Sequence, residues 1–127
     1  MPRNKADYDK GVKMRKKLTG KRFSKGGPTA LAELAPELDE MLNEVIFGRV
    51  WTRPGLELKM RSAITIAALT AMQRLPQLKG HIANGLNAGL SKKEIIEILI
   101  QMAFYAGVPT AVNAFQLAKE VFQEEGV

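Results

Sequence analysis

Apolar residues recur at helical spacing along almost the whole chain, and no segment of useful length alternates apolar and polar residues as a strand does. Around the only histidine, Leu78, Ile82 and Leu86 lie one turn apart, and His81 falls on the same stripe. Glycine and proline separate such segments. The 127 residues are enough for one domain. The sequence therefore predicts an all-α fold, a small helical bundle in a single domain over residues 1–127.

The helix boundaries follow from breakers and caps. Pro36 predicts a break in the second helix, because proline removes a backbone donor from a helix interior. Ser91 and Glu94 have the spacing of a capping box, which predicts a helix start. Loops are expected at residues 25–29 and 47–56. The expected helices cover residues 7–18, 29–47, 57–73, 76–89 and 91–106 and, after a break at Gly107 and Pro109, the residues up to about Glu124.

Positive charge is concentrated in an N-terminal arm. Residues 1–25 hold ten lysines and arginines against two aspartates, whereas the rest of the chain holds nine basic and eleven acidic side chains. Such an arm can contact nucleic acid or an anionic surface. It can also be a solvated helix that packs on a neighbour or on a second subunit. Aromatic residues do not interleave with the lysines as in a single-strand binder, so nucleic-acid binding is not expected.

Cysteine is absent from the sequence. This excludes disulfides, thiolate metal sites and thiol redox chemistry. No run of about 18 apolar residues is present, so no membrane span is expected. The N-terminal residues also lack the apolar core of a secretory signal. These features predict a cytoplasmic protein.

The patterns of several catalytic sites are missing. One histidine without cysteine leaves only carboxylates as metal co-ligands, and none has the spacing of a ligand set, so no metal is expected. No serine has the G-x-S-x-G context of a nucleophile elbow, and the glycine-rich phosphate-binding motifs are absent. The remaining candidates are His81 and the arginines Arg49, Arg53, Arg61 and Arg74.

His81 has two interpretations. It can be a core residue whose ring is satisfied by a backbone carbonyl. It can also be a general acid, because imidazole titrates near neutral pH and burial tunes it. Two of the arginines, Arg49 and Arg53, lie at the loop of residues 51–55, and a guanidinium fork matches carboxylate oxygens well.

A specific set of motifs follows residue 47. It comprises W-T-R-P-G-L at 51–56, R-S at 61–62, the histidine, E-I-I-E-I-L at 94–99 and Y-A-G-V-P-T-A-V-N-A-F at 105–115. Together with D-Y-D-K-G-V-K-M-R-K-K-L-T-G-K-R-F at 7–23, these motifs resemble the 4-carboxymuconolactone decarboxylase family, within the alkylhydroperoxidase D-like superfamily. The resemblance extends over essentially the whole chain.

The chain departs from these relatives at a few positions. Superfamily members with peroxidase activity have a C-x-x-C pair before the matching histidine, where this chain has Arg74 and Gln77, so thiol peroxidase chemistry is not carried over. Arg49 stands where the family pattern has an acidic residue, and Ala106 stands where cysteine is common. These departures concern the substrate more than the fold.

The resemblance implies an alkylhydroperoxidase D-like bundle that decarboxylates a lactone dicarboxylate without a cofactor, in the beta-ketoadipate route of aromatic catabolism. It implies His81 as the proton donor and Arg53 and Arg61 as partners of the substrate carboxylates. Trp51 is then either an apolar wall over the lactone ring or a packing residue. The resemblance also implies a homo-oligomer, often a hexamer built as a trimer of dimers.

Two other function classes stay open. One is a related superfamily enzyme that acts on another carboxylated lactone or acid. The other is a non-catalytic basic binding protein, which only residues 1–25 support.

Overall fold

A computed structural model describes residues 4–23 and 29–127 of the chain. Helices joined by turns make up these residues, and none of them forms a strand, which confirms the predicted all-α class. The chain divides into two compact units, unit 1 (Met1–Leu56) and unit 2 (Glu57–Val127). The prediction of one domain over residues 1–127 stays a prediction.

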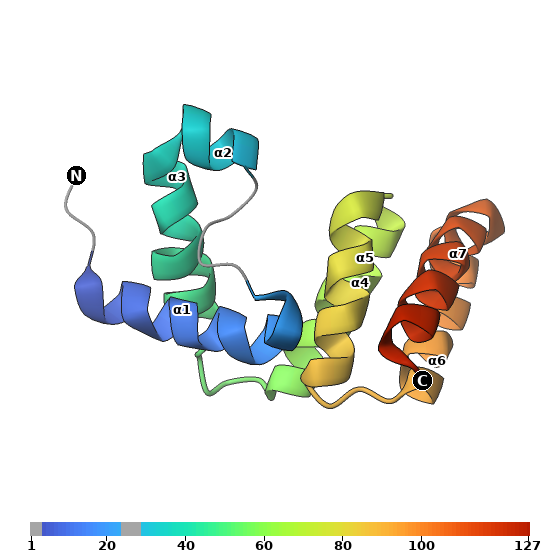
Figure 1. The fold of residues 1–127 in the computed structure, drawn as a ribbon. Coiled ribbons are helices and arrows are strands. Elements are labelled where there is room, and N and C mark those ends of the chain that lie inside the picture. Colours follow the sequence, from blue (N-terminus) through green and yellow to red (C-terminus); the bar gives the residue numbers. More distant parts are fainter. Residues whose placement is uncertain (1–3, 24–28) are drawn as a thin grey trace. The chain divides into compact units, whose positions relative to one another are not determined.

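The described residues of unit 1 form five helical elements. They are α1 (Lys5–Thr19), the 3₁₀ turn η1 (Gly20–Arg22), α2 (Thr29–Leu34), α3 (Pro36–Met41) and the π-helix η2 (Leu42–Val50). Figure 1 labels three of them, α1, α2 and α3. Pro36 occupies the first turn of α3, which confirms the predicted break. Of the predicted loop at 25–29, the first four residues lie outside the described part of the chain, and Thr29 begins α2.

The π-helix corrects the sequence prediction. The segment expected as a loop from residue 47 is helical as far as Val50, and the backbone N–H of Trp51 still donates to the carbonyl of Ile46 at 2.9 Å. This bond reaches five residues back, as in a π-helix, rather than four. The spacing of apolar residues alone does not distinguish a π-helix from an α-helix in so short a segment, because the same apolar residues fit both.

Two glycines bring α1 and η2 into backbone contact. A Cβ atom added at Gly11 would overlap the carbonyl oxygen of Asn43, and one added at Gly48 would overlap the carbonyl oxygen of Asp7. Beside this crossing, the Arg15 guanidinium donates to the Asn43 side-chain oxygen at 2.9 Å. Helix α1 and the π-helix η2 can therefore approach this closely only because Gly11 and Gly48 lack a side chain.

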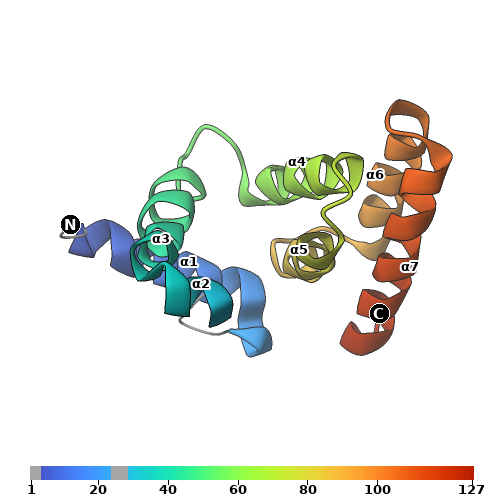
Figure 2. The same ribbon diagram turned by 90° about the horizontal axis from the view of Figure 1, so that it is seen from above.

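Unit 2 is a four-helix arrangement in which consecutive helices run in opposite directions (Figures 1 and 2). Its helices are α4 (Leu58–Ala71), α5 (Leu75–Asn87), α6 (Lys92–Tyr105) and α7 (Val108–Glu125). All four match the predicted ranges to within about two residues. The Ser91 hydroxyl accepts from the Glu94 N–H, and the Glu94 carboxylate accepts from the Ser91 N–H, both at 3.0 Å, which confirms the capping box.

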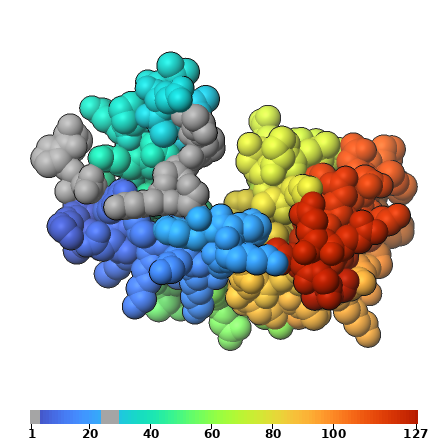
Figure 3. All heavy atoms as spheres, viewed as in Figure 1, coloured from blue at the N-terminus to red at the C-terminus, as the bar shows by residue number. Residues whose placement is uncertain are grey.

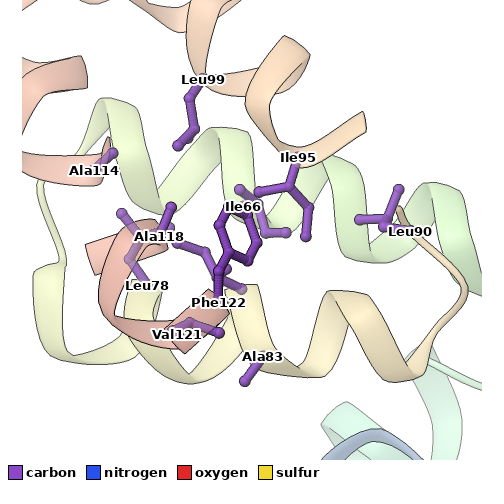
Figure 4. Close-up of a cluster of buried hydrophobic side chains, with 11 residues drawn as sticks. Ile66, Leu78, Ala83, Leu90, Ile95, Leu99, Ala114, Ala118, Val121 and Phe122 are labelled. Atoms are coloured by element: carbon purple, nitrogen blue, oxygen red, sulfur yellow. The ribbon is translucent and has the colours of Figure 1, made fainter. Parts of the chain in front are cut away.

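The core of unit 2 forms where its four helices meet (Figure 4). In the space-filling view α7 lies in front of α6 and covers much of it (Figure 3). The core side chains are almost wholly buried and come from all four helices and the turn before α6. They are Ile66, Leu78, Ile82, Ala83, Leu90, Ile95, Leu99, Ala114, Ala118, Val121 and Phe122.

A side-chain clamp fixes the turn between α4 and α5 to α7. Gln73 has a φ of 54°, the left-handed region that a residue with a side chain seldom adopts. Its amide group donates to the carbonyl oxygens of Thr70 at 2.8 Å and Thr110 at 3.2 Å, and it accepts from Asn113 at 2.7 Å. These bonds offset the backbone strain at this turn.

Among the described residues, no helix has both the length and the apolar character to cross a membrane.

The glycine contact in unit 1 gives a testable prediction. Gly11→Ala should lower the free energy of unfolding by about 3 kcal/mol, the upper part of the usual range for overpacking, because a backbone carbonyl cannot rotate away. Chemical denaturation followed by circular dichroism measures this change. Gly55→Ala is the matched control, since nothing lies within 4 Å of a Cβ there. Equal stability of the two variants would contradict the close contact.

Candidate active site

Arg61 lies on α4 in unit 2. Its side chain is half-buried, and its Nε atom is completely buried. The backbone holds it in the first turn of α4, where its N–H donates to the Glu57 carbonyl at 3.0 Å and its carbonyl accepts from the Thr65 hydroxyl at 2.8 Å. The guanidinium is therefore directed partly into the protein.

His81 lies on α5 between two fully buried residues, Leu78 and Ile82. Pro76 stands at the start of this helix, where the missing N–H costs nothing. The ring is half-buried, and its Nδ1 atom is completely buried. One end of the imidazole is therefore inside the protein, and both interpretations of this histidine stay open.

A close contact between α4 and α5 lies one turn from His81. Gly85 is buried, and a Cβ there would come within 3.0 Å of Ile66, 3.1 Å of Leu90 and 3.3 Å of the Ser62 hydroxyl oxygen. The Ser62 side chain is fully buried, and its oxygen has no hydrogen-bond partner among the described residues. This buried hydroxyl was not singled out from the sequence as more than part of the R-S motif.

Trp51 and Arg53 follow the π-helix of unit 1. Trp51 is 8% exposed and stacks on Phe47, with ring centroids 5.9 Å apart and planes at 25°. The Arg15 guanidinium lies 5.7 Å from the centroid of the Phe47 ring. Arg53 is exposed, and its N–H donates to the Val50 carbonyl at 3.1 Å. Trp51 therefore packs on Phe47, and the predicted contacts of Trp51 and Arg53 with substrate stay predictions.

The four predicted site residues fall into two pairs. Arg61 and His81 lie on α4 and α5, which pack against each other in unit 2. Trp51 and Arg53 lie two residues apart in unit 1. The other two arginines have structural contacts, since Arg49 lies 3.7 Å from the Asp7 carboxylate and the Arg74 carbonyl accepts from the first turn of α5.

A pocket of about 550 Å³ lies between α4 and α6, and none of the predicted site residues lines it. Lys59 and Glu94 form an ion pair at 2.8 Å on its rim. The hydrogen bond from Lys59, helped by the Ser91 N–H, lowers the pKa of the Glu94 carboxyl. The pocket was missed in the sequence because it depends on which helices pack together. Its lining consists of Glu57, Lys59, Met60, Ala63, Leu90, Lys93, Glu94, Glu97 and Ile98.

No metal centre can be assembled from the part of the chain that the structure describes. None of its His, Asp and Glu side chains form a group of three that could hold a metal ion.

Comparison with known proteins adds independent information. The model of the carboxymuconolactone decarboxylase family matches residues 36–120. A 4-carboxymuconolactone decarboxylase from Acinetobacter baylyi is 31% identical over 120 residues, which are 94% of this chain and 90% of the relative. Nitrosuccinic acid decarboxylase npaB from Metarhizium robertsii is 26% identical over 117 residues, which are 92% and 82% of the two chains.

A third relative has no named activity. An uncharacterized 15.0 kDa protein in the nqo9-nqo10 intergenic region of Paracoccus denitrificans is 36% identical over 98 residues, which are 76% of this chain and 73% of the relative. The segment matched by the family model contains all four predicted site residues, Trp51, Arg53, Arg61 and His81.

The buried serine gives a second prediction. Ser62→Ala should leave the free energy of unfolding unchanged or raise it, because a buried hydroxyl without a partner is unfavourable. Thr70→Val is the matched variant on the same helix. Its hydroxyl donates to the Ile66 carbonyl at 2.7 Å, so its loss should cost about 1 kcal/mol. Urea denaturation of both variants measures the two changes. A larger loss of unfolding free energy in Ser62→Ala than in Thr70→Val would show that the Ser62 hydroxyl has a hydrogen-bond partner.

Proposed function

Because the chain belongs to the carboxymuconolactone decarboxylase family, we propose that it is a carboxy-lyase that converts 4-carboxymuconolactone to the beta-ketoadipate enol-lactone and CO₂. The observation that most supports this proposal is the match to the Acinetobacter enzyme, which extends over 94% of this chain. A second relative is also named a decarboxylase, although its acid is different. Removal of a carboxylate is thus the activity that the two named relatives share.

The substrate itself provides the electron sink for this reaction. When the bond between the ring carbon and its carboxylate breaks, CO₂ leaves and the electron pair delocalises through the ring alkene into the lactone carbonyl. A proton must then reach the carbon next to that carbonyl. The protein therefore has to bind a dianion, stabilise charge on the lactone oxygen and deliver one proton.

We assign the proton delivery to His81. Its ring is half-buried on α5 and its Nδ1 atom is completely buried, so the orientation of the imidazole is restricted by its surroundings. A fixed ring with restricted access to water is suited to general acid catalysis. This role uses the exposed part of the ring for the substrate and the buried part for positioning.

We assign the two substrate carboxylates to Arg61 and Arg53, with Trp51 as an apolar surface near the lactone ring. The partial burial of Arg61 supports this role, because an ion pair is stronger where less water surrounds it. Arg53 is exposed and can exchange its present contacts for a ligand. The reacting carboxylate should be the less tightly paired one, since it must leave as neutral CO₂.

A homo-oligomer, with a trimer of dimers as the expected form, is part of the proposal. Large apolar side chains at the end of α6 and the start of α7 are strongly exposed, with Phe104 at 81%, Tyr105 at 80% and Val108 and Val112 at 59%. Apolar surface of this kind marks interaction sites in proteins.

A second candidate function is decarboxylation of a different acid, and the npaB relative favours it. Incubating the purified protein with 4-carboxymuconolactone and, separately, with nitrosuccinic acid distinguishes the two. Release of CO₂ from the lactone above a protein-free control is the expected result. Release only from the other acid would support the second candidate, and no release from either would contradict both.

His81→Gln tests the proton donor. The variant should keep its fold, because an amide can replace one hydrogen bond of the imidazole, and should lose at least about 10²-fold in turnover, the usual scale for a positioned acid. Melting temperature and turnover should be measured on the same preparation. A destabilised variant with full turnover per folded molecule would make His81 a packing residue.

Arg53→Lys should affect binding more than chemistry. Lysine keeps the charge but loses the two-pronged guanidinium geometry, so KM should rise by about tenfold while kcat changes little. Arg74→Lys is the control, because Arg74 is exposed and its backbone N–H and carbonyl form hydrogen bonds that the substitution leaves in place. An unchanged KM in the Arg53 variant would remove this residue from the substrate site.

A further inference from the structure

A pocket of about 360 Å³ lies between the first half of α6 and the second half of α7. We call it the α6–α7 pocket. Its volume is within the range of roughly 300–1,000 Å³ that is usual for small-molecule sites. It shares no lining residue with the pocket between α4 and α6, and none of the four predicted site residues lines it. The α6–α7 pocket is therefore a separate feature of unit 2.

The floor of the α6–α7 pocket is apolar and belongs to the core of unit 2. Ala118 and Phe122 line it and are only 1% and 6% exposed, and Figure 4 shows both side chains within the core cluster. Ile96 and Phe115 also line it, and both are half-buried and pack against that core. Aromatic rings pack favourably against another ring, either offset or edge to face. With two phenylalanines, this floor suits the ring of a small aromatic molecule.

The rim of the α6–α7 pocket is positively charged. Lys92 and Lys119 line the pocket, both are exposed, and none of the lining side chains is acidic. The Lys92 ammonium lies 5.3 Å from the centroid of the Phe122 ring and donates to the Val127 main-chain oxygen at 3.5 Å. A contact of this length is at the limit of hydrogen bonding, so a closer acceptor can replace it. Lys119 forms no ion pair with another described residue.

The acidic residues on the same turns of α7 do not cancel this charge. The carboxylates of Glu120 and Glu124 pair with Lys79 of α5, at 3.3 Å and 3.0 Å. The pocket between α4 and α6 is different, because Glu57 and Glu97 are among its lining residues. An anion is therefore attracted to the α6–α7 pocket more than to the larger one.

We propose that the α6–α7 pocket binds a small aromatic carboxylate. The ring would lie against Phe115 and Phe122, and the carboxylate would accept hydrogen bonds from the ammonium groups of Lys92 and Lys119 at the rim. The amide group of Gln123, which also lines the pocket, can donate another. The floor has no polar side chain for a second charged group, so the site takes one ring with one anionic end.

This binding site does not depend on the proposed decarboxylation, and its test needs no enzyme activity. Because the chain has no cysteine, Gln123→Cys places a single thiol at the pocket. Benzoate, the probe, should slow the alkylation of this thiol by iodoacetamide about tenfold when present at about ten times its Kd, by mass action. Mass spectrometry follows the alkylation, and a benzoate titration gives the Kd. Gln116→Cys is the control, because Gln116 is exposed on α7 outside the pocket, and benzoate should not protect it.

Two comparisons test the charge of the ligand. Benzamide has the same ring without the charge and should bind about fivefold more weakly than benzoate, the upper part of the range for an exposed ion pair. In the Gln123→Cys background, Lys119→Gln should raise the benzoate Kd by a similar factor. Lys93→Gln is the matched control, since Lys93 is exposed and does not line this pocket, and it should leave the Kd nearly unchanged.

Three results would each overturn the proposal. They are a thiol at position 123 that benzoate does not protect, equal protection by benzamide, and an equal effect of the two lysine substitutions on the benzoate Kd. The second result would mean that the pocket binds apolar molecules without regard to charge.

Discussion

The candidate site depends on helices that contact each other at glycines, where no side chain keeps them apart. In unit 1 the backbones of α1 and η2 meet at Gly11 and Gly48, and no side-chain rotation can relax a contact with a carbonyl group. In unit 2 a buried glycine, Gly85, brings α5 against α4. Because a helix is stiff over a few turns, each contact also fixes the residues near it along the chain. Trp51 follows η2 directly, and His81 precedes Gly85 by one turn.

The helices of unit 2 could be predicted because their ends contain local chemical signals. Pro76 fits only the first turn of a helix, the capping box at Ser91 satisfies two backbone donors, and Gly107 adopts a φ of 106° that favours glycine. The π-helix of unit 1 could not be predicted in this way. A shift from i−4 to i−5 hydrogen bonding changes neither composition nor apolar spacing enough to be recognised in one short segment.

The candidate site shows the same division between local and long-range information. The position of His81 on the apolar face of α5 follows from its spacing to Leu78 and Ile82, which the sequence contains. Which helices pack against each other does not follow from the sequence, because the apolar face of one helix can pack against that of many others. Three features depend on such pairing: the contact of Ser62 with α5, the ion pair between Arg49 and Asp7, and the pocket between α4 and α6. These features could be recognised only from the three-dimensional arrangement of each unit.

Helix α4 places a proposed substrate contact beside exposed apolar side chains. Arg61 follows Met60 directly in the sequence and lies three residues before Ile64. Met60 and Ile64 are 53% and 54% exposed. In the proposed homo-oligomer, a second subunit that covered these two side chains would remove water from the surroundings of the Arg61 guanidinium. A lower local dielectric strengthens the attraction between a guanidinium and a carboxylate. Association over this part of α4 would therefore favour dianion binding at Arg61, which gives the exposed apolar side chains of this helix a chemical as well as a structural role.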